Sequence, residues 1–387
     1  MDVIIVGAGA SGMSAAIECA KSGAKVTLLD SNSKAGRKLL VTGNGRCNAA
    51  NMIFDADKYN KSGREFAEKV FEKVGLEKIL SFLEETGIPT RDIRGYIYPY
   101  NEEASYVVRA FEKRLSGLGV RLKFNNKVER ISYDETCGKF KVTSNGWDYS
   151  ADRVILSCGS SASRVEGADG SGYFLAESLG HSTVSLKPAL VPLVCEGKFF
   201  SRWSGVRVRG SVSAYSNGRL IGRDEGQLQL TQYGISGIPV FNISGAAATA
   251  LSEGEETECR IDFAPDYSRE QIEAMVSVTG KEAVYSILPK KLADVIVSEG
   301  CPEKTADRIK CFCLRIKDTL GREHAQVMTG GIPVNEIDVN TMESGLVKGL
   351  YFSGEIIDVD GVCGGYNLMF AWATGIIAGM SAGNDKD

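Results

Sequence analysis

Three glycines after an apolar run form the first group of residues suited to chemistry. Gly7, Gly9 and Gly12 follow the run Val3–Val6 and open a stretch with helical spacing. In a strand–turn–helix unit, the first glycine permits the tight turn, the second lets backbone N–H groups approach a pyrophosphate, and the third lets the helix pack closely. The helix N-terminus adds unpaired donors and a partial positive charge. The spacing therefore predicts a dinucleotide site.

An acidic residue completes this fingerprint. Asp30 directly follows the next predicted strand, Lys25–Leu29. A carboxylate at that place accepts hydrogen bonds from ribose hydroxyl groups and disfavours a 2′-phosphate by charge repulsion. The alternative, a glycine-rich turn in an unrelated α/β protein, does not account for strand, turn, helix and acid in this order. FAD and NAD both remain compatible with the fingerprint.

A basic, glycine-rich segment after Asp30 separates these two cofactors. Residues 36–48 contain Arg37 and Lys38, followed by the run Gly43–Asn48. The two basic groups would neutralise a diphosphate, and the run would place backbone and amide donors against a flat ring system. Because an NAD dehydrogenase has no need for such a loop here, the segment favours FAD. A solvated basic turn is the alternative.

A second glycine-rich helix start lies near the other end of the chain. Residues 353–368 predict a strand end, an acidic loop and a helix N-terminus. If this N-terminus faces the pyrimidine edge of a flavin, its dipole would stabilise the negative charge of the reduced ring and raise the reduction potential. The alternative is a core helix whose glycines only allow close packing.

Together, these motifs resemble a bacterial flavoprotein family that includes aminoacetone oxidase and a bile-acid enone reductase, within the two-dinucleotide-binding-domain flavoproteins. The resemblance extends over nearly the whole chain and includes Leu230–Gly237, Thr329–Gly331 and Thr341–Ser344. It implies FAD contacts from Ser11, Asp30, Lys38, Asn44, Val128, Glu355, Asn367 and Leu368, with the Val128 strand pairing its backbone with adenine. Asp30 stands where the family usually has Glu; the charge is the same, so we expect the same cofactor.

The predicted cofactor-binding residues come from both ends of the chain and from two strand ends between them. They are Gly7, Gly9, Ala10, Ser11, Gly12, Asp30, Ser31, Arg37, Lys38, Gly43, Asn44, Gly45, Arg46, Cys47, Asn48, Val128, Cys158, Gly159, Gly354, Glu355, Asp360, Gly361, Gly364, Gly365, Tyr366, Asn367 and Leu368. The sequence has no second GxGxxG motif with an acidic strand end. We therefore expect non-covalent FAD, which either receives electrons from NAD(P)H as a transient donor or exchanges them by another route.

The remaining pattern predicts an α/β protein with insertions. Residues 1–186 plus 330–387 predict a discontinuous Rossmann-like FAD-binding domain. Alternating apolar and polar residues in 187–262 predict an antiparallel β subdomain, which the resemblance implies to be barrel-like, and residues 263–329 predict a small helical subdomain. Both ends of the chain would then build one site, and the insertion would cover it.

Composition limits the partners. The net charge of −4 disfavours a nucleic-acid partner, so a small-molecule substrate is expected. The chain opens on a buried-strand pattern without a charged leader, which predicts a cytoplasmic location with reduced cysteines. No metal site is expected, because Cys311 and Cys313 are the only close cysteine pair and the two histidines stand apart. Two uncharged runs, Gly234–Ser252 and Leu368–Gly383, are rich in small residues and predict buried helices rather than membrane spans. The oligomeric state stays open.

No residue is a persuasive catalytic acid or base, so the catalytic residues stay unassigned. His181 is interpreted as structural and His324 as solvated. Cys47 is expected to face the flavin, but without a CxxC partner it does not support a disulfide-reductase mechanism. The candidate donors to a substrate carbonyl, each of which also suits aromatic packing, are Tyr98, Tyr233 and Tyr366.

Three functions remain compatible with this site. The favoured one is reduction of an activated C=C bond, such as the enone of a steroid-like or other hydrophobic substrate, with electrons from NAD(P)H. The second is oxidation of an amine with electron transfer to oxygen. The third is a flavin-binding protein with a non-catalytic role, regulatory or linked to RNA, against which the acidic net charge argues.

Overall fold

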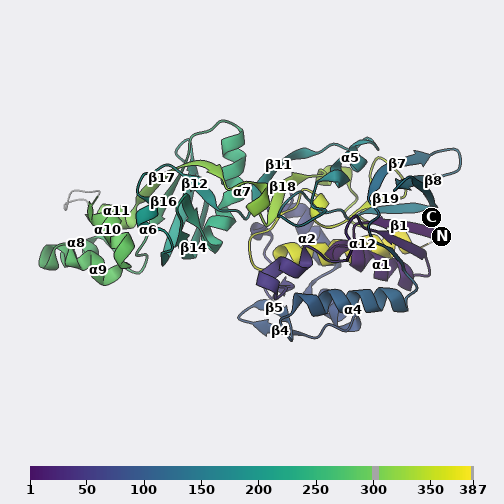
Figure 1. Ribbon diagram of the computed structural model, residues 1–387, viewed down its shortest axis with the longest axis horizontal. Helices are drawn as coiled ribbons and strands as arrows, with labels where there is room; N and C mark the ends of the chain where they lie inside the picture. Colours follow the sequence, from purple (N-terminus) through teal and green to yellow (C-terminus); the bar gives the residue numbers. More distant parts are fainter. Residues whose placement is uncertain (299–304, 385–387) are drawn as a thin grey trace. The chain divides into compact units, whose positions relative to one another are not determined.

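The chain forms two compact units. The computed structural model describes residues 1–298 and 305–384 (Figure 1). Unit 1 comprises residues 1–186 and 329–387, and unit 2 comprises residues 187–328. The division expected from the sequence, at 186 and 330, lies at nearly the same places. Within the described residues, no helix is long and apolar enough to cross a membrane.

A five-stranded parallel sheet forms the centre of unit 1, which confirms the predicted Rossmann-like fold. Its strand order is β19-β10-β1-β2-β6, and neighbouring strands pair in parallel register. The strands are almost continuously apolar because both faces of a parallel sheet are covered. Their bounds are β1 Asp2–Val6, β2 Lys25–Leu29, β6 Arg121–Lys123, β10 Arg153–Leu156 and β19 Leu350–Phe352.

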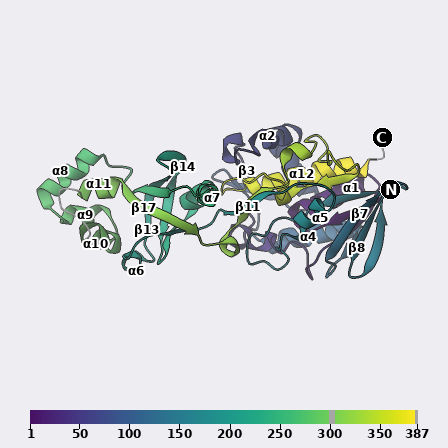
Figure 2. The ribbon, with the colours of Figure 1, turned by 90° about the horizontal axis from the view of Figure 1, so that it is seen from above.

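Two helices from opposite ends of the chain, α1 (Ala10–Lys21) and α12 (Tyr366–Gly383), lie side by side on this sheet (Figure 2). They approach closely because α12 has three glycines, spaced four residues apart, on the side that faces α1. A Cβ atom would stand 2.4 Å from the Ser11 carbonyl oxygen at Gly375, and 2.5 Å from the Ala15 carbonyl oxygen at Gly379. The third, Gly383, meets Cys19. Residues later in α12 contact residues later in α1, so the two helices run parallel.

The stagger of the two helices places their N-termini apart. Gly375 faces Ser11 at the start of α1, whereas α12 begins at Tyr366, nine residues earlier. At a rise of about 1.5 Å per residue, the N-terminus of α12 therefore lies about 13 Å behind the N-terminus of α1 along their common direction. Unit 1 therefore presents two helix N-termini of the same orientation at two levels.

The remaining elements of unit 1 are smaller. Two three-stranded sheets, β3-β5-β4 and β7-β8-β9, flank the central sheet, and β11 pairs with β18. Their bounds are β3 Ala50–Asn51, β4 Thr90–Ile93, β5 Tyr96–Pro99, β7 Val128–Asp134, β8 Lys139–Ser144, β9 Trp147–Ala151, β11 Val184–Ala189 and β18 Val327–Gly331. The helices are α2 Arg64–Lys73, α3 Leu76–Glu85, α4 Ala104–Gly117 and α5 Ser171–Glu177.

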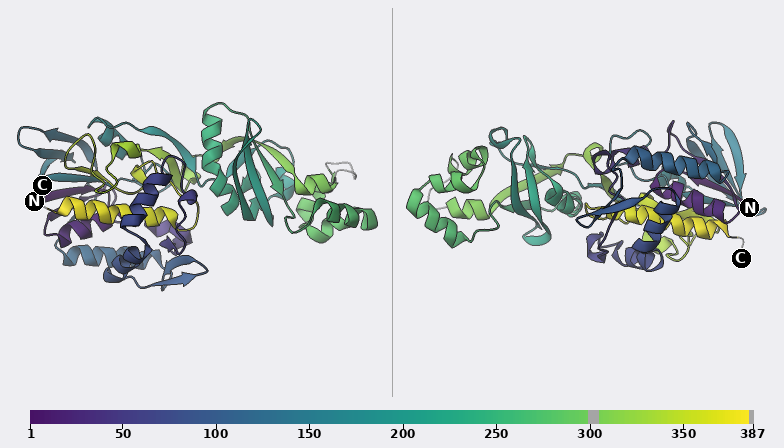
Figure 3. Two further views of the ribbon diagram at one scale, coloured as in Figure 1. Left: turned by 180° about the vertical axis from the view of Figure 1, so that it is seen from behind. Right: turned by 90° about the horizontal axis from the view of Figure 1, so that it is seen from below.

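Unit 2 is a closed barrel with an attached helical group (Figure 3). The strand order is β12-β15-β14-β13-β16-β17, and the pairs are antiparallel. The bounds are β12 Leu193–Cys195, β13 Arg207–Ser216, β14 Arg219–Leu230, β15 Gly234–Ser236, β16 Thr257–Asp262 and β17 Phe312–Thr319. The helices are α6 Phe200–Trp203, α7 Ile238–Ser252, α8 Arg269–Thr279, α9 Glu282–Ile287, α10 Lys290–Ser298 and α11 Thr305–Lys310.

The structure corrects the predicted helical subdomain at 263–329. Helices α8 to α11 lie between β16 and β17, so they interrupt the barrel rather than follow it. Strand β17 closes the barrel between β12 and β16. In β17, buried Phe312, Leu314 and Ile316 alternate with exposed residues, which is the period of a half-buried strand. The neighbouring charged helical faces concealed this short alternation.

We expect the glycine contact between α1 and α12 to carry a large share of the stability of unit 1. Gly379→Val should lower the free energy of unfolding by about 3 kcal/mol, because the new side chain meets the backbone of α1. Met380→Val, at the half-exposed neighbouring position, is the matched control and should change it far less. Denaturant unfolding of both variants measures the difference. Equal stabilities would contradict the packing argument.

Candidate active site

The turn between β1 and α1 has the geometry of a phosphate-binding turn. Gly7 has φ +105°, and a Cβ there would stand 2.4 Å from the Ser157 carbonyl oxygen. A Cβ at Gly12 would stand 1.9 Å from the Gly7 carbonyl oxygen. At Gly9, by contrast, no atom of the described chain lies within 4 Å of an added Cβ. The first and last glycines thus serve packing, and Gly9 borders open space in front of the α1 N-terminus.

Asp30 stands beside this turn with its carboxylate held by backbone groups. One oxygen, Oδ2, accepts from the Ala8 amide at 2.6 Å. The other, Oδ1, accepts from the amide and the side chain of Asn32 at 2.7 and 2.9 Å. Because a carboxylate oxygen has two acceptor sites, Oδ2 retains one for a ribose hydroxyl. The Asp30 side chain is therefore fixed at the end of β2.

The basic loop at residues 36–48 and the acidic loop that follows β19 come from opposite ends of the chain but lie in contact. The ammonium group of Lys38 lies 2.5 Å from a carboxylate oxygen of Glu355, 317 positions away. The hydroxyl of Ser160, after β10, donates to the other oxygen of Glu355. Lys38 and Glu355 are 28% and 19% exposed, so this ion pair is partly shielded from water. The ammonium group has further donors for a phosphate or a flavin.

Arg37 does not join this pair. Its guanidinium group lies 3.1 Å from the carboxylate of Glu166, and both side chains are solvent-exposed. An exposed pair of this kind is weak. The expected pair of basic groups thus separates into one inside the site and one on the surface.

Left-handed backbone shapes the loop that follows. Gly43, Asn44 and Gly45 have φ of 56°, 56° and 84°, and Cys47 has φ 58°. Only small or amide-bearing residues adopt this region readily. We expected Cys47 to face the flavin. This expectation is wrong, because the Cys47 side chain is fully buried in the core. Burial raises the pKa of the Cys47 thiol to about 12, so only the backbone of this residue is available to a ligand.

Buried hydroxyl groups fasten the strand ends to the two helices. The hydroxyls of Ser157 and Ser353 lie 2.8 Å apart, and that of Ser11 donates to the Ser353 carbonyl at 3.3 Å. The amide of Gly354 donates to the Thr374 hydroxyl at 3.0 Å. These contacts connect the ends of β10 and β19 with α1 and α12. Ser11 was the only one of these hydroxyl residues expected in the site.

The start of α12 is held by its own side chains. Asn367 donates to the Gly361 carbonyl and accepts from the Gly361 amide, both at 2.8 Å. Tyr366 is buried, and its hydroxyl donates to the Ile53 carbonyl at 3.2 Å. Gly365 has φ +95°, and a Cβ there would stand 2.6 Å from the Ala50 backbone. Tyr366 is therefore a packing residue and not a donor to a substrate, which corrects that candidate role.

The other candidate residues lie apart from these contacts. Tyr98 is half-buried under the Arg46 guanidinium, 4.4 Å from the ring centre. Burial raises the pKa of the Cys158 thiol to about 12, with the charges of Asp30 and Asp169 adding to the effect. Val128 begins β7, and Tyr233 belongs to unit 2. His324 is exposed, as expected.

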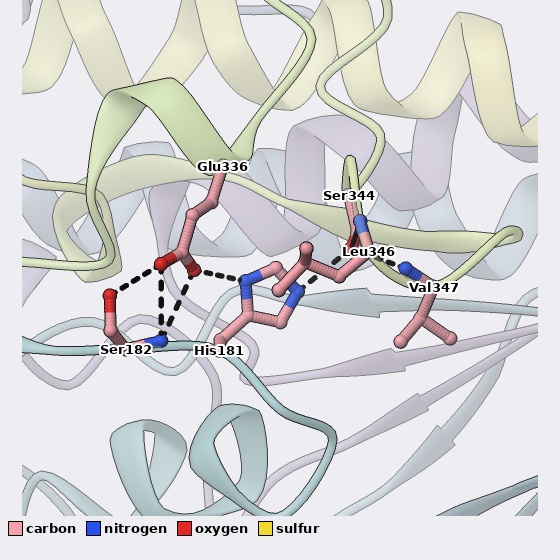
Figure 4. A network of polar contacts seen from close by, with 6 residues as sticks. All are labelled: His181, Ser182, Glu336, Ser344, Leu346 and Val347. Atoms are coloured by element: carbon pink, nitrogen blue, oxygen red, sulfur yellow. Dashed lines mark hydrogen bonds and ion pairs between the residues drawn. The ribbon is translucent and has the colours of Figure 1, made fainter.

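His181 forms a buried polar network that is structural (Figure 4). Its Nδ1 lies 2.7 Å from a carboxylate oxygen of Glu336, and its Nε2 lies 2.8 Å from the Ser344 hydroxyl oxygen. That oxygen also accepts from the amides of Leu346 and Val347, at 3.0 and 2.9 Å. With both acceptor sites occupied, the Ser344 hydroxyl must donate to Nε2, which specifies a neutral imidazole with its proton on Nδ1.

This serine, histidine and glutamate order is that of a hydrolase triad, but it does not perform that chemistry. The oxygen of Ser344 has no free acceptor site, and both Ser344 and His181 are buried. The structural interpretation of His181 is confirmed. The network joins the predicted Thr341–Ser344 motif to the segment before β11.

The acidic loop contains two further carboxylates, which differ in their partners. Asp358 Oδ1 accepts from the Asn60 side chain and from the Gly330 amide, both at 3.1 Å. The Oδ1 atom of Asp360, by contrast, is inaccessible to solvent and has no hydrogen-bond partner among the described residues. Burial raises the pKa of Asp360 to about 7, and the charges of Asp358 and Glu355 act in the same direction.

Exposed apolar side chains gather beside the start of α12. Met52, Ile53, Phe54 and Tyr96 are between 37% and 66% exposed. Ile53 is tied to α12 by the Tyr366 hydroxyl, and the Tyr96 ring lies 3.2 Å from the position of a Cβ at Gly364. We call these four residues the apolar group of unit 1. Adjacent exposed apolar residues of this kind indicate a binding surface.

Comparisons with known proteins identify the family of this chain. A family model described as "HI0933-like protein Rossmann domain" matches residues 1–381. The chain belongs to this family. A 3-dehydro-bile acid delta(4,6)-reductase of Clostridium scindens is 39% identical over 402 residues, which cover 98% of each chain. A ribosomal RNA dihydrouridine synthase of Haemophilus influenzae is 30% identical and covers 98% of this chain and 97% of the relative.

A solved structure shows the same fold. The 3-ketosteroid-delta4-(5alpha)-dehydrogenase of Rhodococcus jostii RHA1 has a TM-score of 0.52 at 16% identity, with 99% of this chain and 97% of that chain covered. Family and relatives support an FAD-dependent oxidoreductase and confirm the predicted family. The residues present also fit FAD: open space at Gly9, a fixed carboxylate at Asp30, and two parallel helix N-termini about 13 Å apart along their axis.

The open space at Gly9 allows a test of its assigned role in binding the FAD pyrophosphate. Gly9→Val should fold normally, since Gly9 has φ −81° and its Cβ meets no described atom, but should lose FAD because the side chain fills the pyrophosphate space. The matched control is Gly117→Val, at another open glycine in α4. The flavin absorbance per protein after purification measures the outcome. A Gly9→Val protein as yellow as the control would refute the assigned role.

The Glu336 network predicts a pH dependence of stability. Burial opposes ionisation of Glu336, but hydrogen bonds from Ser182 and His181 prevail and lower its pKa below the ordinary 4.5. A lowered folded-state pKa gives stability that is complete above the ordinary pKa and is lost as the pH falls through the lowered one. Wild type should therefore lose stability more steeply than Glu336→Gln in this acidic range. Parallel unfolding curves at each pH would contradict it.

Proposed function

We propose that the protein is an FAD-dependent reductase of a C=C bond conjugated to a carbonyl group, acting on a steroid-like or other hydrophobic small molecule. The curated relative with 39% identity is named as a bile-acid reductase, and the 30% relative as a dihydrouridine synthase. Dihydrouridine differs from uridine by one saturated C=C bond beside a carbonyl. Both names therefore describe the same kind of reduction, and the higher identity favours the hydrophobic substrate.

The observation that carries this proposal is the apolar group of unit 1. Met52, Ile53, Phe54 and Tyr96 stand beside the helix start that is expected to face the flavin. A hydrophobic substrate loses unfavourable contact with water there, at about 25 cal/mol per Å² of apolar area buried. A charged or strongly hydrated amine would gain little from this surface. The apolar group thus favours a hydrophobic enone over an amine.

The chain's residues bind and orient the cofactor. With FAD bound, Asp30 would accept from a ribose hydroxyl, the amides at the α1 N-terminus would hold the pyrophosphate beside Gly9, and Lys38, already oriented by Glu355, would supply a cation. The N-terminus of α12 would place a partial positive charge near the part of the ring where negative charge collects on reduction. Bound FAD would supply the hydride for the substrate and recover electrons from NAD(P)H.

The setting of the reaction follows from the same features. Nine cysteines in the described residues are free thiols, which suits a reducing compartment such as the cytoplasm. The net charge of −4 argues against RNA as the substrate, although one curated relative is named for ribosomal RNA. We therefore propose a small molecule as the partner.

Anaerobic stopped-flow spectroscopy tests the proposal. NADH or NADPH should bleach the flavin band of the purified protein, and a 3-keto-4-ene steroid should restore it. Small amines should leave the oxidised band unchanged. Bleaching by an amine with peroxide release in air would establish the oxidase instead. Restoration by a uridine-containing ribosomal RNA fragment but by none of the enones would shift the substrate class to RNA.

A further inference from the structure

Unit 2 has two cysteines whose sulfur atoms lie close together on its surface. Cys311 and Cys313 are both exposed, and their Sγ atoms lie 3.9 Å apart. The Cys313 thiol also lies 3.8 Å from the Cys311 carbonyl oxygen, to which it can donate. The cofactor residues described above belong to unit 1. The proposed reduction therefore gives this pair of nucleophilic side chains no role.

The start of β17 brings the two sulfurs to the same side of the chain. The strand begins at Phe312, and residues two apart in a strand point to the same face. Phe312, between the two cysteines, points the other way. It is buried in the core of unit 2, where its ring centre lies 5.6 Å from that of Trp203. Both thiols consequently face solvent.

Backbone hydrogen bonds hold the chain on both sides of the pair. The Cys311 amide donates to the Asp307 carbonyl at 2.7 Å, which closes the last turn of α11. Cys313 pairs with Arg260 of the neighbouring strand β16. The two cysteines therefore span the junction between α11 and β17, where the chain passes from the helical group back into the barrel.

The two thiols differ in how readily they lose a proton. Partial burial and the neighbouring Cys311 thiol raise the pKa of Cys313 to about 11. Cys313 therefore keeps its proton at neutral pH and can donate it to the Cys311 sulfur. The thiolate is the nucleophilic form of cysteine, and a hydrogen bond to the charged form favours it. This arrangement makes Cys311 the attacking sulfur and Cys313 the second thiol.

We propose that Cys311 and Cys313 form a reversible oxidation site, which hydrogen peroxide converts into an intramolecular disulfide. The Cys311 thiolate attacks one peroxide oxygen, the O–O bond breaks, and hydroxide leaves, so that Cys311 becomes a sulfenic acid. The Cys313 sulfur then attacks the Cys311 sulfur, the S–O bond breaks, and the departing oxygen takes the Cys313 proton to form water. The two thiols lose two electrons and the peroxide gains them. Two thiols and one peroxide give one disulfide and two water molecules.

The held backbone should make this disulfide easy to reduce. Residues two apart in an extended strand have Cα atoms about 6.6 Å apart, near the upper limit of about 6.8 Å for a disulfide. Bond formation must therefore bend the segment, and the hydrogen bond to Asp307 and the pairing with β16 oppose this bending. Strained or exposed disulfides are the readily reduced ones. A small thiol such as glutathione should restore the reduced pair.

Mass spectrometry of one tryptic peptide tests the site in the FAD-loaded full-length protein. Trypsin cleaves after Lys310 and Arg315, so the peptide of residues 311–315 contains both cysteines. After brief treatment of the reduced protein with equimolar hydrogen peroxide, this peptide should be two hydrogens lighter and resist thiol alkylation, and glutathione should reverse both changes. The comparison thiol is Cys137, exposed between β7 and β8 beside the Asp134 carbonyl, which should remain open to alkylation.

Single substitutions separate the roles of the two thiols. Cys313→Ser should accumulate a Cys311 sulfenic acid that dimedone labels, because the second thiol is missing. Cys137→Ser is the matched control and should behave as wild type. Phenylarsine oxide, which bridges two thiols with loss of water, gives a readout without oxidation: it should bind to residues 311–315 in wild type and in neither Cys311→Ser nor Cys313→Ser.

Four results would overturn the proposal. They are a sulfinic acid on the 311–315 peptide in place of the internal bond, a disulfide to a second chain, loss of the Cys137 thiol as fast as that of the pair, and binding of phenylarsine oxide that persists in the Cys313→Ser variant. A disulfide that glutathione does not reduce would contradict its reversibility. None of these outcomes depends on the substrate of the flavin site, so the oxidation site stands or falls apart from the proposed reduction.

Discussion

The close approach of α1 and α12 is the constraint on which the site depends. Side chains normally keep packed helices about 8–10 Å apart. The glycines at 375, 379 and 383 remove that spacing, so the backbones themselves touch. The contact fixes the register of the two helices, and the register fixes how far apart their N-termini lie. A dinucleotide with charge at its pyrophosphate and at its reduced ring finds partial positive charge at both places.

The acidic loop shows how partners decide the ionisation of similar groups. Lys38 lies against Glu355, and Asp358 accepts hydrogen bonds from the Asn60 side chain and the Gly330 amide. Asp360 has fewer partners and two anionic neighbours. Carboxyl groups within six positions of one another thus have different partners. The same principle applies to His181, whose two neighbours determine its tautomer.

Sequence alone predicted the parts of the molecule that depend on local pattern. The glycine fingerprint, Asp30 and the parallel sheet follow from spacing along short segments. The side-chain partners did not follow, because they come from far away in the chain: Lys38 meets a carboxylate 317 positions later, and Tyr366 meets a carbonyl 313 positions earlier. Burial of Cys47 and the strand character of Phe312–Thr319 also depend on tertiary context.

The discontinuity of unit 1 has a consequence for its assembly during translation. The central sheet joins β1 at the start of the chain with β19, whose first residue is Leu350, and α12 follows later still. Unit 2, by contrast, is continuous in sequence and complete at residue 328. Nascent domains fold as units once their residues have emerged. The barrel of unit 2 can therefore fold during translation, before β19 is available to pair with the first strands of unit 1. Those early strands must stay unaggregated until then, and flavin capture is a late event.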